Sequence, residues 1–146
     1  GALKLAEPLL ADPFFVTYGD SYIPLNYADL WAYFHRYDQP ALMVVYENHD
    51  RYDRSNVALE GPWVSLYDKA NPTPEMFYID AGVSLLRKDV LELIPEGRPV
   101  DLAEVFQHLV RQRQLLSFET RQRFYEVGSL TGLDEFSQLV ASGELP

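Results

Sequence analysis

Apolar residues along this chain fall into helix-like and strand-like stretches in turn. The first eleven residues place four apolar side chains on one helical face, and Asp12-Pro13 ends this helix because a residue before proline avoids helical angles. Residues 14–18 then form an apolar β-type run that stops at Gly19-Asp20. We therefore predict a helix over residues 1–11 and a buried strand that carries Asp20 to the rim of a sheet, where open α/β folds bind ligands.

A second helix and strand follow in the same order. Asn26, with Asp29 three positions later, marks a helix start, and Gln39-Pro40 marks its end. Residues 41–47 (ALMVVYE) are apolar almost throughout, which is typical of a strand buried on both faces. Because a helix between two buried strands favours parallel pairing, the pattern predicts an α/β fold with a mixed, mostly parallel sheet flanked by helices.

The rest of the chain predicts shorter elements. Gly82 interrupts an apolar strand, which indicates that a ligand or a neighbouring group comes close to the backbone there. Asp101 has the position of a helix N-cap, and Gly143 has that of a helix stop. The expected elements are a polar loop at 48–55, a hairpin of strands 56–60 and 63–68, a strand at 76–86, helices at 88–94, 101–112 and 133–141, and strands at 115–118 and 123–127.

Composition narrows the function classes. The chain has 146 residues, of which 47% are apolar, enough for a single domain, and neither a membrane-length apolar run nor a signal sequence is visible. We expect a soluble, cytoplasmic protein without membrane contact. The absence of cysteine excludes disulfides and thiolate chemistry. Because the net charge is −10, nucleic acid is not an expected partner, and the three scattered histidines have no zinc-ligand spacing.

Several segments resemble the sugar-phosphate nucleotidyltransferases, which join an NTP to a sugar 1-phosphate and release pyrophosphate. Their order along the chain matches the family over nearly the whole length. The segments are Gly1-Ala2-Leu3, similar to the end of a GTAGAL-type segment that contacts the base; residues 16–22 (VTYGDSY), similar to the strand whose Gly-Asp holds magnesium; residues 64–69 (VSLYDK) and 76–86 (MFYIDAGVSLL), similar to the Glu-Lys segment and the NAGIY strand; and residues 124–129 (FYEVGS), similar to YDIGT.

The resemblance implies a Rossmann-like nucleotidyltransferase fold and a role for particular residues. Asp20 and Glu126 would hold Mg²⁺, which prefers a few carboxylate oxygens together with phosphate and water. Lys69 would act as a point charge on the sugar phosphate. The remaining candidates for substrate binding are Gly1, Ala2, Tyr18, Gly19, Asp68, Asp80, Ala81 and Gly82, of which residues 80–82 would meet the sugar hydroxyls.

The chain departs from the family pattern at two places. Glu126 stands where the family more often has Asp. The family's opening strand, its GGxGTRL-type loop and the following PK segment are absent from these residues, so the resemblance implies an N-terminally truncated domain, the larger C-terminal part of the whole. Since the glycine-rich loop wraps the triphosphate with backbone N–H groups, we expect the chain to bind NTP poorly.

Simpler interpretations and other functions stay open. Asp20 can be an ordinary turn residue, Lys69 a solvated loop lysine, and Glu126 a surface ion partner of Arg121 or Arg123. An alternative function is an inactive binding module that self-associates through the apolar sheet edge left by a missing strand. A glycosyltransferase of related fold ranks last, because its usual second acid would fall at Tyr22.

Overall fold

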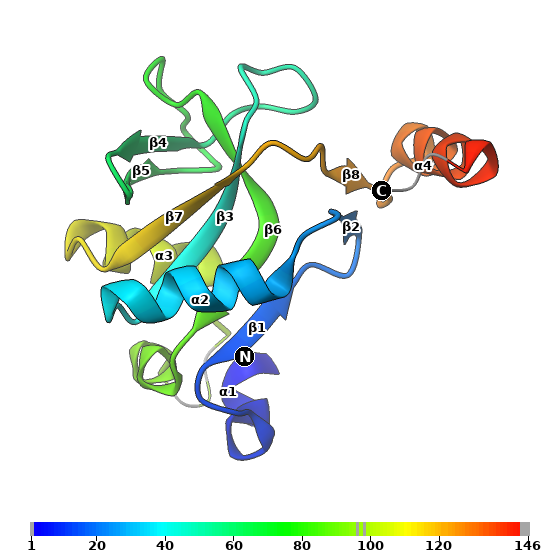
Figure 1. The fold of residues 1–146 in the computed structure, drawn as a ribbon. Helices are drawn as coiled ribbons and strands as arrows, with labels where there is room; N and C mark the ends of the chain where they lie inside the picture. The colour runs from blue at the N-terminus through cyan, green and yellow to red at the C-terminus, as the bar shows by residue number, and fades with distance from the viewer. Residues whose placement is uncertain (1, 96, 98, 144–146) are drawn as a thin grey trace.

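The computed structural model describes residues 2–95, 97 and 99–143, which form a six-stranded sheet, a two-stranded ribbon and flanking helices (Figure 1). In chain order the elements are α1 (Ala2–Ala6), the 3-10 helix η1 (Glu7–Leu9), β1 (Phe14–Thr17), β2 (Ser21–Tyr22), α2 (Tyr27–Tyr37), β3 (Ala41–Glu47), β4 (Val57–Glu60), β5 (Trp63–Tyr67), β6 (Tyr78–Leu86), the 3-10 helix η2 (Lys88–Leu93), α3 (Leu102–Arg111), β7 (Leu115–Thr120), β8 (Tyr125–Glu126) and α4 (Leu130–Ser142).

The large sheet has the strand order β1-β6-β3-β7-β5-β4 and closes on itself where Val57 of β4 pairs with Tyr78 of β6. The α/β class is confirmed, but the expectation of a mostly parallel sheet is wrong, because β3 with β7 is the one parallel pair in the described part of the chain. Strands β1 and β3 do run in the same direction, as the α2 connection requires. Strand β6, however, lies between them and is antiparallel to both.

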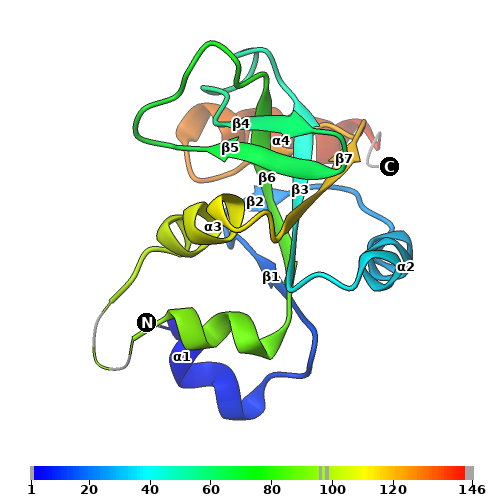
Figure 2. The same ribbon diagram turned by 90° about the vertical axis from the view of Figure 1, so that its left-hand side faces the viewer.

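Two apolar cores lie on the two faces of the sheet. Helix α3 buries Phe106 and Leu109 on one face, and α2 buries Leu30 and Phe34 on the other. Figure 2 shows α3 and α2 on opposite sides of the central strands. Strand β3 sends alternate side chains into each core, which explains why residues 41–47 are apolar without a polar face.

Helix ends follow local chemistry, with two differences from expectation. Asn26 accepts from the Ala28 amide at 3.1 Å and Asp101 from the Ala103 amide at 2.9 Å, so both N-cap predictions are confirmed. The expected helix over 1–11 is instead two short pieces, because Pro8 lies in the first turn of η1. Helix α4 begins three residues before the expected start, since the Ser129 side chain caps it by accepting from the Gly132 amide.

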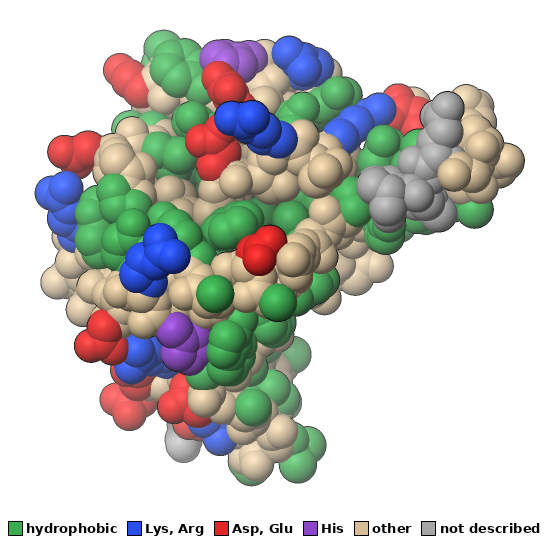
Figure 3. Space-filling view, in the orientation of Figure 1, with side chains coloured by type: hydrophobic (Ala, Val, Ile, Leu, Met, Phe, Trp, Pro, Cys, Tyr) green, Lys and Arg blue, Asp and Glu red, His purple; other side chains and the backbone are tan. Residues whose placement is uncertain are grey.

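The β2–β8 ribbon and α4 project from one side of the main body (Figure 1), and the space-filling view shows α4 standing out from the surface (Figure 3). Phe136 of α4 packs on Tyr22 and Tyr125, with ring centroids 5.0 and 6.0 Å apart. Within the described ranges, no helix has the length and apolar character needed to cross a membrane.

Candidate active site

The β2–β8 ribbon brings Asp20 and Glu126 together from opposite ends of the chain. Ser21 is paired with Glu126 across the ribbon, and the Val127 amide donates to the Asp20 carbonyl at 2.7 Å. The side chains of Asp20 and Glu126 are both exposed, so a ligand from solvent can reach their carboxylates. The two predicted metal ligands are therefore neighbours.

Gly128 leaves the space on which the two carboxylates converge. A Cβ atom at this residue would lie 2.5 Å from Glu126 Oε1 and 3.2 Å from Asp20 Oδ2. Within the described ranges, no three His, Asp or Glu side chains cluster as a metal site. Two carboxylates nevertheless fit Mg²⁺, because this ion commonly takes one or two protein carboxylates and completes its shell with water and phosphate oxygens.

Glu126 is not the ion partner of a neighbouring arginine. Arg123 instead pairs with Glu135 of α4, and its guanidinium contacts the rings of Tyr52 and Tyr125, 4.2 and 4.6 Å from their centroids. Gly132 lets α4 approach the Glu126 carbonyl, since a Cβ there would overlap that oxygen. These contacts hold the strand that carries Glu126 while leaving its carboxylate available.

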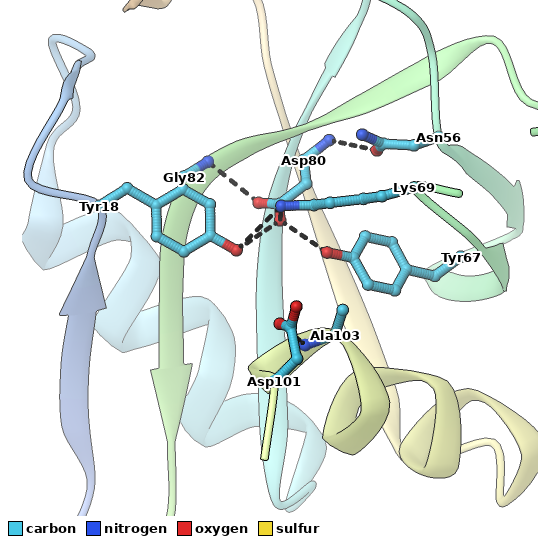
Figure 4. A network of polar contacts seen from close by, with 8 residues as sticks. All are labelled: Tyr18, Asn56, Tyr67, Lys69, Asp80, Gly82, Asp101 and Ala103. Carbon is cyan, nitrogen blue, oxygen red and sulfur yellow. Dashed lines mark hydrogen bonds and ion pairs between the residues drawn. The ribbon is translucent and has the colours of Figure 1, made fainter. Parts of the chain in front are cut away.

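A second group of polar side chains surrounds Lys69 (Figure 4). The Lys69 ammonium donates to the Tyr18 hydroxyl at 3.3 Å and lies 3.3 Å from Asp80 Oδ2. It also lies 4.7 Å from the centroid of the Tyr18 ring. The lysine side chain keeps 43% of its surface exposed, whereas the Asp80 side chain keeps 1%. The sequence thus predicted Lys69, Tyr18 and Asp80 as site residues, and the structure places them in contact.

The Asp80 carboxylate is fully engaged in hydrogen bonds. Oδ2 accepts from the hydroxyls of Tyr18 at 2.9 Å and Tyr67 at 3.1 Å, and Oδ1 accepts from the Gly82 amide at 3.0 Å. Burial, followed by the charge of Asp80, raises the pKa of Tyr18 and of Tyr67 well above the usual range. Both phenols therefore remain protonated donors to the carboxylate. Direct sugar contact by Asp80 stays a prediction.

Gly82 links the two groups. Its φ of +81° is available to glycine at little cost, and it lies where the β3–β6 register shifts. A Cβ at Gly82 would lie 3.0 Å from the Tyr18 ring and 3.1 Å from Ser21 Oγ. The expected close approach is therefore confirmed, and the neighbours are the side chains on either side of the Gly19-Asp20 turn.

The other predicted binding residues are less closely grouped. Asp68 Oδ1 accepts from the amides of Ala70 and Asn71 at 2.8 and 2.9 Å, which caps the turn that presents Lys69. Ala81 is buried in the core on the α2 face, and Gly19 is surrounded by open space. Ala2 begins α1, which lies away from the ribbon (Figure 1), and Gly1 lies outside the described residues.

Three further residues contribute to this site and were not among the predicted site residues. Tyr67 is an inward-facing position of β5, Asn56 accepts from the Asp80 amide at 3.0 Å, and Gly128 provides the space between the carboxylates. Residues 63–67 (WVSLY) do not alternate regularly between apolar and polar side chains, so the strand pattern gives no sign that Tyr67 points inward. No local signal links any of the three to Asp20 or Asp80, because their partners are distant in sequence.

This chain is similar in sequence to some known proteins and similar in fold to others. Mannose-1-phosphate guanyltransferases of Candida albicans and Yarrowia lipolytica are 33% and 30% identical over 136 and 135 residues; these matches cover 88% of this chain and 37% of each relative. The chain thus spans little more than a third of the length of these relatives. No model of a known protein family matches the sequence.

Solved structures share the fold at lower identity. The inositol-1-phosphate CTP transferase from T. maritima superposes with a TM-score of 0.76 at 21% identity, over 96% of this chain and 60% of that one. A UDP-glucose pyrophosphorylase complexed with UDP-glucose gives a TM-score of 0.77 at 15% identity, over 97% and 61%. The chain is thus similar in sequence to part of the mannose-1-phosphate guanyltransferases and shares the fold of these solved transferase and pyrophosphorylase structures.

Proposed function

We propose that this chain carries the magnesium site and the sugar-phosphate site of an enzyme that transfers a nucleotidyl group from an NTP to a sugar 1-phosphate. The observation that carries the proposal is the convergence of Asp20 and Glu126 at Gly128, on the ribbon that follows Tyr18. The names of the sequence relatives make mannose 1-phosphate and GTP the first substrates to test.

The reaction needs alignment of two anions more than it needs covalent chemistry from the protein. A phosphate oxygen of the sugar 1-phosphate forms a bond to the NTP α-phosphorus, the bond between that phosphorus and the bridging oxygen breaks, and pyrophosphate leaves. Asp20 and Glu126 would hold Mg²⁺, which supplies neutralisation of the phosphate charge when bound. Lys69 would hold the attacking phosphate, because its ammonium is partly exposed beside this ribbon.

The proposal is tested by isothermal titration with mannose 1-phosphate and with GTP in the presence of Mg²⁺, together with a pyrophosphate-release assay. We expect Asp20→Asn and Glu126→Gln to weaken Mg²⁺-dependent binding at least tenfold. Asp29→Asn, an exposed acid at the start of α2, is the matched control and should leave binding unchanged. Equal binding by the wild type and both site variants would exclude the carboxylate pair from the function.

The same assays separate the alternatives. Binding of sugar 1-phosphate that is unchanged without Mg²⁺ and in both carboxylate variants would favour a binding module. Transfer of a sugar from a nucleotide sugar to an acceptor, with release of a nucleoside diphosphate, would favour a glycosyltransferase. The proposed activity requires pyrophosphate and the nucleotide sugar in equal amounts.

A further inference from the structure

Asp80 is the only carboxylate among the buried side chains of the described residues. A buried charge is costly unless it is paired and hydrogen-bonded. Here three donors and one ammonium surround the two oxygens of Asp80. The number of partners shows that the surrounding residues are arranged around this charge.

The partners of Asp80 form a path from the interior to the surface. Tyr67 and the Gly82 amide approach the carboxylate from the interior, and Tyr18 donates to it from the end of β1. Lys69 covers the outer side, where it contacts both Asp80 and the Tyr18 hydroxyl. Figure 4 shows the lysine side chain passing the Tyr67 ring and ending with its ammonium beside the Asp80 carboxylate and the Tyr18 hydroxyl.

The Lys69 ammonium is therefore fixed but not enclosed. Of its three N–H donors one bonds the Tyr18 hydroxyl, and the ammonium forms an ion pair with Asp80. The exposed 43% of the lysine side chain leaves room for an anion beside this pair. Because Tyr18 gives its own proton to Asp80, its oxygen is left to accept from Lys69.

We propose that Asp80 is a positioning residue, which holds Lys69 and Tyr18 in place for the phosphate of the sugar 1-phosphate and does not itself touch the sugar. This inference rests on the proposed function, since it assigns Lys69 a phosphate partner. An ammonium that is already fixed loses less conformational freedom when the anion binds. Without the Asp80 carboxylate, Lys69 keeps its charge, but its ammonium is no longer held in one place.

A double-mutant cycle tests this role. Asp80→Asn, Lys69→Met and the double variant are titrated with mannose 1-phosphate in the presence of Mg²⁺, with Asp38→Asn, an exposed acid that pairs with Arg87, as the control. We expect each single variant to bind at least tenfold more weakly and the double variant to bind no more weakly than Lys69→Met. A purely structural role for Asp80 would instead weaken both backgrounds equally.

A second measurement needs no substrate. The acylation rate of each lysine by an amine-reactive reagent is followed by peptide mass spectrometry, with Lys88 as the internal reference. We expect Lys69 to react slowly in the wild type and several-fold faster in Asp80→Asn, while Lys88 is unchanged. If Asp80→Asn fails to fold, Tyr18→Phe removes one link between Lys69 and the carboxylate, and it should shift both measurements in the same direction.

The two measurements separate the two ideas. A wild type that binds no sugar 1-phosphate overturns the proposed function and, with it, the phosphate role of Lys69, while the acylation rates still report whether Asp80 holds the lysine. A wild type that binds, together with an Asp80→Asn variant of unchanged affinity and unchanged Lys69 acylation, overturns the positioning role and leaves the proposed function intact.

Discussion

Adding a methyl group at Gly128 should impair metal binding at the Asp20–Glu126 pair without unfolding the protein. In Gly128→Ala the new Cβ would lie 2.5 Å from Glu126 Oε1 and 3.2 Å from Asp20 Oδ2. Since ordinary contacts of this kind are longer, the Glu126 oxygen must retreat by about 1 Å or rotate away. The carboxylate pair would then no longer converge on one point.

We expect Gly128→Ala to weaken Mg²⁺ binding and to leave the stability of the fold nearly unchanged. Losing one ionised ligand is worth about 1.5–3 kcal/mol, which weakens Mg²⁺ binding by roughly ten- to a hundredfold. The free energy of unfolding should change by less than about 1 kcal/mol, because both acidic side chains are exposed and can move, and alanine reduces the freedom of the unfolded chain.

Paramagnetic broadening by Mn²⁺ provides the assay. The amide signals of residues 127–129 are followed in an NMR titration, with Mg²⁺ added afterwards as competitor, and denaturant unfolding is measured on the same samples. Gly19→Ala is the matched control, because it also adds one methyl group beside Asp20 but meets nothing within 4 Å. This control should bind Mn²⁺ as the wild type does.

Two outcomes would contradict a divalent-ion site at Gly128. If Gly128→Ala binds Mn²⁺ as tightly as the wild type, the space at Gly128 is not where the ion lies. If the wild type shows no broadening near Gly128 at millimolar Mn²⁺, the carboxylate pair does not bind a divalent ion, and the proposed role of Asp20 and Glu126 is wrong.

Three further predictions concern the core, the Lys69 turn and the sheet edge. Phe106 is fully buried, so Phe106→Ala should lower the free energy of unfolding by about 3–5 kcal/mol in a denaturant titration; a loss below about 1 kcal/mol would contradict the α3 core. The amides of Asn71 and Ala70 hold the pKa of Asp68 below 3.8. The stabilisation from this carboxylate is therefore present above pH 3.8 and is lost as the pH falls through the lower folded value, which carboxyl ¹³C NMR can follow; a midpoint at or above 3.8 would disprove the capped turn. Strand β1 pairs on one side only within the described residues, so we expect self-association in sedimentation experiments, and a monomer at every concentration would count against it.

Local sequence patterns predicted most elements because they depend on near neighbours. The caps at Asn26 and Asp101, the stop at Gly143 and the buried strand at 41–47 all depend on short-range chemistry or on the period of the apolar residues. The first helix was less accurate, because the apolar period continues through Pro8 although proline disturbs the helix there.

The order of strands in the sheet could not be predicted from these local patterns. The alternation of helix and strand indicated the shared direction of β1 and β3, but it does not encode the insertion of β6 between them or the contact of Val57 with Tyr78 that closes the sheet. Pairing depends on side chains that meet only after collapse, so an apolar strand alone is compatible with several partners.

Asp20, Glu126 and Lys69 can be picked out of the sequence alone, as can the strand that contains Gly82, because a known family carries similar segments in the same order. Which of these residues meet depends on the fold. It brought Asp20 beside Glu126 through ribbon pairing, and it placed Asp80 in the interior with Tyr18, Tyr67 and Lys69 as partners. Burial and distance arise from contacts between segments far apart in the chain, and a buried carboxylate acts through its partners, whereas an exposed one can meet a ligand directly.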